Sequence, residues 1–207
     1  MTNNDRVVLV TGALGGIGSA IVARYLKEGM KVGLVDFDAE AGEQRVNALR
    51  KDYRNVFFAC ADVSDFKQCE LACQQIETAL GPIDTLILNA GISPKKDGKK
   101  APIFEMSEEE WRLVVGVNLN GAFNFCRIVS PGMVQRRQGR IVMMSSVAGK
   151  AYLGLFGSGT LKRYERCADR IYTSSGWRIR TVRDYGQRTC AGPYRYAPPQ
   201  NCFHRTQ

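Results

Sequence analysis

The sequence predicts an α/β fold in which helices cover both faces of a doubly wound parallel sheet. Short apolar runs rich in β-branched residues alternate with longer segments whose apolar residues recur at helical spacing. The short runs are apolar at every position, which is typical of parallel strands that are buried on both faces. A succession of such strand and helix units requires right-handed crossovers, which place the helices on both sides of one sheet.

The expected elements follow one another without an internal repeat. We expect strands at residues 7–10, 32–35, 56–59, 85–88 and 140–144, and helices at 17–26, 39–49, 66–80 and about 108–136. Gly29 is expected to close the first helix. Ser107 and Glu110 have the spacing of a capping box, so the last helix should begin after Ser107. The charged segment 93–100 predicts a solvated loop, with a basic clamp for a substrate as the alternative.

A glycine-rich turn separates the first expected strand from the first expected helix. Its residues are Thr11, Gly12, Ala13, Leu14, Gly15, Gly16, Ile17 and Gly18. Glycines allow the backbone to approach a pyrophosphate at the positive end of a helix, so this turn predicts a Rossmann-type dinucleotide site. The alternative is a tight turn that binds no ligand.

Asp36 stands at the end of the second expected strand. A carboxylate in this position can accept hydrogen bonds from both ribose hydroxyls of a dinucleotide and repels a 2′-phosphate, which favours NAD over NADP. Neither Phe37 nor Asp38 supplies the arginine that NADP would require. The alternative role for Asp36 is that of a turn or helix cap.

The TGxxxGxG spacing of the glycine turn resembles the signature of the short-chain dehydrogenase/reductase family, and further segments resemble other motifs of that family. The resemblance implies that Asp62 and Val63 contact the adenine ring. It also implies that Asn89, Ala90 and Gly91, after the fourth strand, lie along the cofactor and steady the sheet.

Two further motifs resemble segments that hold catalytic residues in the family. Asn118, in the segment VNLNG, resembles the asparagine that breaks the long helix and holds a proton-relay water; the alternative is a satisfied amide within a helix. Ser146, in SSVAG, resembles the serine that orients the substrate. The family's tyrosine and lysine, spaced YxxxK, are absent from the chain. Lys162 and Tyr164 stand in the wrong order and spacing, so we do not assign them the acid/base role.

The charge distribution divides the chain into two parts. Residues 1–159 carry 19 basic and 17 acidic side chains, whereas residues 160–207 carry 10 and 3, so the net charges are +2 and +7. We expect an NAD(P)-binding domain over 1–159, incomplete on its carboxy-terminal side, and a basic tail over 160–207 that is too poor in apolar residues to complete it. A shift of reading frame near Gly159 would explain the tail. A nucleic-acid-binding arm is a weaker explanation, because no known binding module is present.

The chain shows no apolar stretch of signal-peptide or membrane-spanning length, so we expect a cytoplasmic protein without membrane or nucleic-acid partners. The 7 cysteines lack CxxC spacing and are expected to be buried thiols. Cys69 and Cys73 stand four residues apart, but without a nearby histidine they do not predict a metal site.

The resemblance implies an oxidoreductase that moves a hydride between NAD(H) and a secondary alcohol or ketone, of the 3-oxoacyl reductase or polyol dehydrogenase type. The alternative is a catalytically inactive truncated or frameshifted fragment that at most binds dinucleotide. The family's usual assembly implies a homo-oligomer formed through the helix at 108–136.

Overall fold

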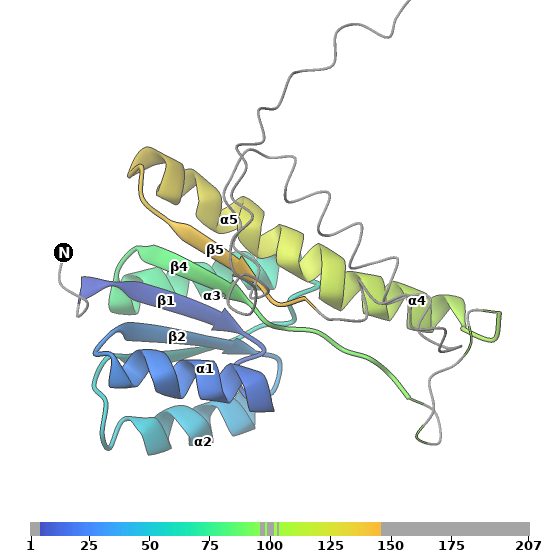
Figure 1. Ribbon diagram of the computed structural model, residues 1–207, viewed down its shortest axis with the longest axis horizontal. Coiled ribbons are helices and arrows are strands. Elements are labelled where there is room, and N and C mark those ends of the chain that lie inside the picture. The colour runs from blue at the N-terminus through green and yellow to red at the C-terminus, as the bar shows by residue number, and fades with distance from the viewer. Residues whose placement is uncertain (1–4, 96–97, 99–101, 103, 146–207) are drawn as a thin grey trace, which may run out of the picture.

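The computed structural model describes residues 5–95, 98, 102 and 104–145 of the chain. Five parallel strands form one sheet in the order β3-β2-β1-β4-β5, which confirms the predicted fold class (Figure 1). The strands are β1 (Val7–Thr11), β2 (Lys31–Asp36), β3 (Val56–Cys60), β4 (Ile83–Leu88) and β5 (Arg140–Met143).

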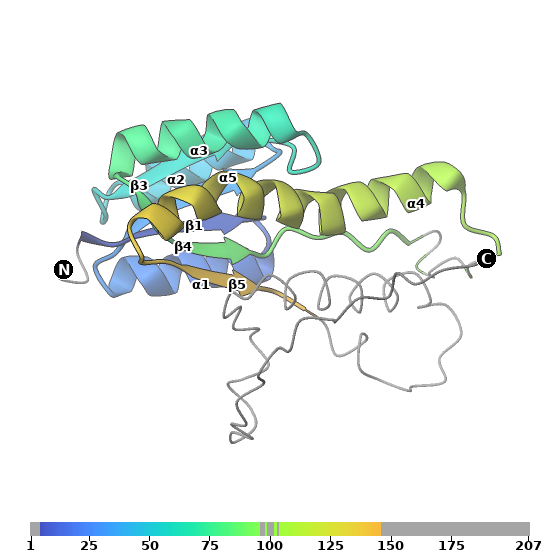
Figure 2. The ribbon, with the colours of Figure 1, turned by 90° about the horizontal axis from the view of Figure 1, so that it is seen from above.

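Helices cover both faces of this sheet (Figure 2). They are α1 (Gly16–Lys27), α2 (Ala39–Leu49), α3 (Phe66–Leu80), α4 (Glu108–Val115) and α5 (Gly121–Gln135), with a π-helical turn, η2 (Gly116–Asn120), between the last two. Successive residues of β1 point to opposite faces. Val7 and Leu9 pack in the core that α3 and α5 complete, while Val8 and Val10 pack against α1 and α2.

The strand order places the topological switch point between β1 and β4. The chain leaves β1 toward β2 and β3 on one side, then crosses to β4 and β5 on the other. In open sheets of this kind, a crevice forms outside the carboxyl ends of the two strands at which the order reverses. The fold therefore places such a crevice at the carboxyl ends of β1 and β4.

The fourth strand begins two residues earlier than predicted, because Asp84 belongs to it. This carboxylate is only 7% exposed, and its Oδ2 accepts a hydrogen bond of 3.0 Å from the Val7 amide at the start of β1. A buried carboxylate is unusual in a strand core, and the sequence pattern alone therefore excluded it. Its hydrogen bond satisfies an amide that the sheet ladder leaves free.

The long helix begins after Ser107, as predicted, and the Ser107 hydroxyl accepts a hydrogen bond of 3.1 Å from the Glu110 amide. The helix is not continuous, because η2 inserts a π-helical turn that contains Asn118. Such turns are typical of functional positions in helices. In contrast to the expectation from the sequence, the stretch Glu108–Gln135 has the length and apolar composition to cross a membrane. Core helices share these properties, and Phe125, Val129 and Met133 pack in the protein core.

Phe125 is expected to be essential for the stability of this core. Its side chain is fully buried, whereas Phe123, on the same helix, is 47% exposed. Phe125→Ala should lower the free energy of unfolding by about 3–5 kcal/mol, because it leaves a cavity between α5 and the sheet. Urea denaturation of Phe125→Ala and of the control Phe123→Ala measures the difference. Equal losses in the two variants would contradict the described packing of α5.

Candidate functional site

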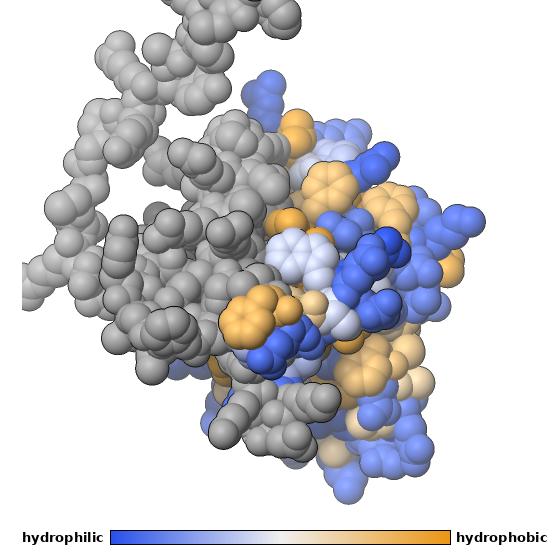
Figure 3. Space-filling view, turned by 90° about the vertical axis from the view of Figure 1, so that its right-hand side faces the viewer, coloured by the Kyte–Doolittle hydropathy of each residue, from blue (hydrophilic) through white to orange (hydrophobic). Residues whose placement is uncertain are grey.

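A cleft of about 740 Å³ lies at the carboxyl ends of the strands. Figure 3 views the protein from the side toward which the strands run in Figure 1, and hydrophobic and hydrophilic residues are interspersed there. The cleft is lined by Gly12, Leu14, Gly15, Gly16, Ile17, Gly18, Asp36, Phe37, Asp38, Ala41, Ala61, Asp62, Val63, Asn89, Ala90, Gly91, Ile92, Leu113 and Val117. Most residues of the predicted cofactor site therefore surround one cavity.

The glycine turn forms the floor of the cleft, and two of its glycines are required by geometry. Gly12 has a φ of +62°, a left-handed conformation that glycine adopts without strain. A Cβ atom on Gly18 would stand 2.1 Å from the Gly12 carbonyl oxygen, so no larger residue fits there. The turn leads directly into α1, whose cap residue Gly15 has no side chain to bind the free amides. Those amides can therefore bind an anion in the cleft.

Thr11 and Asn89 fasten the glycine turn to the end of β4. The Thr11 hydroxyl accepts hydrogen bonds of 3.1 Å from the amides of Asn89 and Ala90, and it donates one of 3.4 Å to the Ile87 carbonyl. In return, the Asn89 Nδ2 donates to the carbonyls of Thr11 (3.1 Å) and Gly12 (2.9 Å). Thr11 itself is only 1% exposed, so its hydroxyl supports the cleft from beneath.

Asp36 ends β2 and closes the cleft on the side of that strand. Its Oδ2 accepts a hydrogen bond of 3.0 Å from the Leu14 amide, and its Oδ1 accepts one of 2.9 Å from the Phe37 amide. The helix cap that we considered for Asp36 is formed by Asp38, which accepts a hydrogen bond from the Ala41 amide at the start of α2. Asp36 thus faces the cleft with an anionic group that the glycine turn orients.

Asp62 and Val63 line the same cleft beyond β3, in a loop that α5 holds in place. The Asp62 Oδ1 accepts hydrogen bonds from the backbone amide (2.8 Å) and the hydroxyl (2.7 Å) of Ser64. The Val63 carbonyl accepts a hydrogen bond of 3.0 Å from the Asn124 Nδ2. The absence of a side chain at Gly121 lets α5 approach Val63 closely enough for this bond. Asn124 is 7% exposed and was missed in the sequence, where it is one polar residue within an apolar helix.

Asn118 is buried within η2, and both the oxygen and the nitrogen of its side-chain amide bind the segment after β4. Its Oδ1 accepts a hydrogen bond of 2.7 Å from the Ile92 amide, and its Nδ2 donates one of 2.9 Å to the Ile92 carbonyl. A two-point clamp therefore joins the long helix to the chain that follows Gly91. Ser146 lies outside the described residues, as do Lys162 and Tyr164.

The cysteines of the described segments are packing residues or exposed thiols. Burial raises the pKa of Cys69, Cys73 and Cys126 to about 12, so these thiols stay protonated at neutral pH. Cys69 and Cys73, on α3, are buried in the core, which confirms their predicted packing role. Cys60 is exposed, so the expectation that the cysteines are buried is wrong for this residue. Within residues 5–95 and 104–145, no group of three or more histidine, cysteine or acidic residues is arranged to hold a metal.

A doubly wound parallel sheet with a glycine-rich turn at its switch point defines the Rossmann class of folds. Within that class, the chain belongs to the short-chain dehydrogenase family, whose model, described as short chain dehydrogenase, matches residues 6–158. The resemblance drawn from the sequence motifs is thereby confirmed.

Several known proteins are similar to the chain. Acetoacetyl-CoA reductase of Allochromatium vinosum is 38% identical over 154 residues, which cover 73% of this chain and 60% of the relative. A 3-oxoacyl-[acyl-carrier protein] reductase with bound NAD from Brucella melitensis is 34% identical with a TM-score of 0.77, covering 84% of this chain and 66% of that one. Gluconate 5-dehydrogenase from Burkholderia cenocepacia, in complex with NADP and tartrate, is 26% identical with a TM-score of 0.72, covering 82% of this chain and 64% of that one.

The chain spans about three fifths of the length of the first curated relatives, with 58% of Nodulation protein G from Azospirillum brasilense and 60% of the acetoacetyl-CoA reductase. The matched part contains the glycine turn, Asp36, the Asn89 segment and Asn118, because the family model runs from residue 6 to residue 158.

Thr11→Val tests the fastening of the cleft. Valine has nearly the shape of threonine, but it leaves the half-buried amides of Asn89 and Ala90 without their acceptor. The expected loss in free energy of unfolding is about 1–3 kcal/mol. Chemical denaturation measures it, and amide hydrogen exchange should accelerate at Asn89 and Ala90. Thr11→Ser retains the hydroxyl and should retain slow exchange, so fast exchange in this control would contradict the assigned hydrogen bonds.

Thiol alkylation at pH 8 tests the burial of the cysteines. A thiol whose pKa is about 12 is ionised to about one part in ten thousand at this pH, and only the thiolate reacts. The native protein should therefore be alkylated at the exposed Cys60 and protected at Cys69, Cys73 and Cys126. Peptide mass spectrometry reports each site separately, with urea-unfolded protein as the control. Equal labelling of Cys60 and Cys73 in the native state would refute the described core.

Proposed function

We propose that residues 1–159 form an NAD-binding domain and that the chain is an oxidoreductase acting on a secondary alcohol or ketone, with residues 160–207 as a basic tail. One observation carries the proposal: the glycine turn at the start of α1 and the Asp36 carboxylate face the same cleft at the switch point. An anion site and a hydroxyl acceptor in one cleft are what a dinucleotide requires.

Different residues of the cleft are proposed to bind different parts of the dinucleotide. The turn from Thr11 and Gly12 to Gly15, Gly16, Ile17 and Gly18 would hold the pyrophosphate through backbone amides. Asp62 and Val63 would border the adenine ring, with Asn124 fixing their loop through the Val63 carbonyl. Asn89, Ala90 and Gly91, at the end of β4, would lie along the cofactor.

Asp36 is the basis for proposing NAD rather than NADP. Its carboxylate is oriented by the Leu14 amide and can accept from ribose hydroxyls, whereas a 2′-phosphate would be repelled by its charge. Phe37 and Asp38, which line the same part of the cleft, contribute no positive charge. The similar structures include one with bound NAD and one with bound NADP, so the preference rests on this chain's own residues.

The nicotinamide ring supplies the hydride chemistry when the cofactor is bound. The protein's task is to orient the alcohol or ketone and to move a proton at its oxygen. Ser146 is proposed to orient that oxygen. Asn118 is proposed to serve the proton relay through its backbone carbonyl, because its side-chain amide is already bound to Ile92. The chain contains no YxxxK, so the group that exchanges the proton with the substrate is left unassigned.

We further propose that the protein is cytoplasmic, binds a small alcohol or ketone of the 3-oxoacyl or polyol type, and assembles through the helix at 108–136. The exposed side chains of Trp111 and Leu113 on α4 favour such a contact. An inactive fragment that only binds dinucleotide is the competing outcome, and the missing YxxxK motivates it.

Binding of NADH and NADPH to the full chain tests the proposed site. Fluorescence titration should show NADH binding at least about tenfold tighter than NADPH, a difference of about 1.4 kcal/mol. Asp36→Asn retains an acceptor for the Leu14 amide but removes the charge, so it should narrow or abolish this preference. Asp38→Asn is the matched control and should keep it. Tighter binding of NADPH by the unaltered protein would overturn the assignment of Asp36.

Turnover separates the two functional outcomes. Oxidation of NADH in the presence of 3-oxoacyl and keto-sugar substrates would support the oxidoreductase, and Ser146→Ala should then abolish it. Tight NADH binding without turnover of any such substrate would identify a binding fragment instead.

A further inference from the structure

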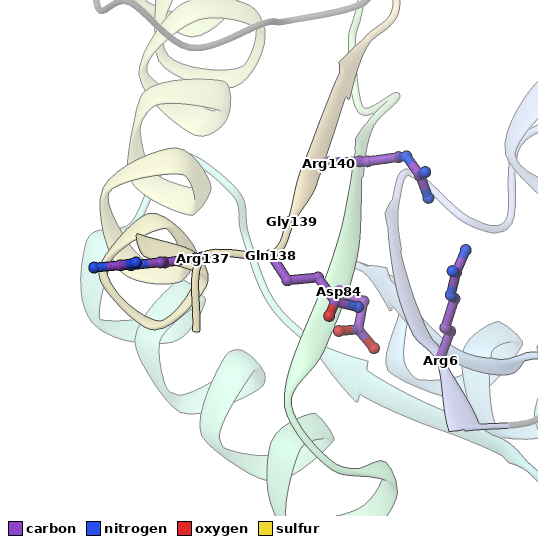
Figure 4. A pocket seen from close by; sticks show the side chains of 6 residues that line it. All are labelled: Arg6, Asp84, Arg137, Gln138, Gly139 and Arg140. Carbon is purple, nitrogen blue, oxygen red and sulfur yellow. The ribbon is translucent and has the colours of Figure 1, made fainter. Parts of the chain in front are cut away.

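A second cavity, of about 400 Å³, lies at the opposite end of the sheet from the cleft. It is lined by Arg6, Asp84, Arg137, Gln138, Gly139 and Arg140, which belong to the amino-terminal ends of β1, β4 and β5 (Figure 4). None of these residues takes part in the proposed dinucleotide site. Three arginines and one aspartate give this lining an excess of two positive charges.

Two of the arginines converge from strands that flank β4. Arg6 immediately precedes β1, and Arg140 begins β5. Neighbouring strands lie about 4.8 Å apart, so the backbones that carry these side chains are separated by roughly 10 Å across the sheet. Figure 4 shows the Arg6 and Arg140 side chains extending toward each other over β4, while the Arg137 side chain points away. The two guanidinium groups thus form opposite walls of one space.

The Asp84 carboxylate offsets only one of the two guanidinium groups, those of Arg6 and Arg140, that extend into this space. The Asp84 carboxylate is engaged by the Val7 amide, as described above. Other cations at this end have protein acceptors, since Lys31 donates to the Leu80 carbonyl (3.1 Å) and Arg136 to the Ile83 carbonyl (2.8 Å). By contrast, the Arg6 Nε is buried and has no hydrogen-bond partner among the residues that the structure describes. A buried guanidinium donor without an acceptor is costly, and an anion would supply that acceptor.

We propose that this cavity binds a phosphoryl anion, either free phosphate or the phosphate group of a small metabolite. A tetrahedral phosphoryl group presents oxygens in several directions, so it can accept from two guanidinium groups on different strands. A carboxylate has two oxygens in one plane and is satisfied by a single arginine fork. A phosphoryl anion is also opposite in sign to the net positive charge of the lining. The bound anion bridges β1 and β5 across β4 and stabilises the folded sheet by mass action.

The test compares phosphate binding by the full chain and by two variants that lose the same charge. Arg140→Gln removes one wall of the cavity at an exposed position, so the fold should be retained, as circular dichroism would verify. Arg112→Gln is the control, because Arg112 is an exposed residue of α4, outside the cavity. Calorimetric titration with inorganic phosphate at constant ionic strength should show binding to the unaltered protein and to Arg112→Gln, and roughly tenfold weaker binding to Arg140→Gln.

Thermal unfolding gives a second measurement. Phosphate should raise the melting temperature of the unaltered protein above that in chloride of equal ionic strength, and Arg6→Gln should lose this increase. Glycerol 3-phosphate in place of phosphate distinguishes an ester ligand from the free ion; binding of either, lost in Arg140→Gln, supports the site. Equal phosphate affinity in Arg140→Gln and Arg112→Gln would place the anion elsewhere, such as at the glycine turn, and would overturn the proposal. Absence of phosphate binding would overturn it too.

Discussion

The hydrogen bonds between Thr11 and the Asn89 segment are the constraint on which the sheet and the cleft both depend. At the switch point the chain leaves β1 toward β2 and returns to the neighbouring position only at β4. Pairing between β1 and β4 ends at Val10 and Ile87, so no sheet hydrogen bonds join the segments that follow. The Thr11 hydroxyl and the Asn89 amide satisfy the backbone groups that this divergence leaves free. The glycine turn is therefore held in one conformation, with its amides directed toward the cleft.

Other elements of the cleft are positioned by similar contacts between a polar side chain and the backbone. Asn118 clamps Ile92, Asn124 holds the Val63 carbonyl, and Asp36 holds the Leu14 amide. Each of these side chains comes from one element and fixes a loop that follows another. The loops around the cleft are thus fixed by the helices and strands of the framework, which favours a preformed site over one that must be ordered by its ligand.

The two proposed anion sites, at opposite ends of the sheet, differ in the source of their positive potential. At the carboxyl end the positive potential comes from uncharged backbone amides at the start of α1. These amides are accessible to a ligand because the glycines of the turn have no side chains that would keep it away. At the amino end it comes from the formal charges of Arg6 and Arg140. The first arrangement follows from the topology of the fold, whereas the second depends on the side chains of this chain.

The sequence by itself determined the order of the elements, the parallel sheet and most of the residues that line the cleft, because apolar periodicity and glycine spacing are local properties that persist in the fold. Helices at 39–49 and 66–80 lie where they were predicted. Only the tertiary structure decided that Asp84 belongs to β4, that the helix break expected at Asn118 is a π-helical turn, and that Asn124 supports the cleft. The physical reason is shared: each depends on a hydrogen-bond partner 26 to 77 residues away, which no local pattern encodes.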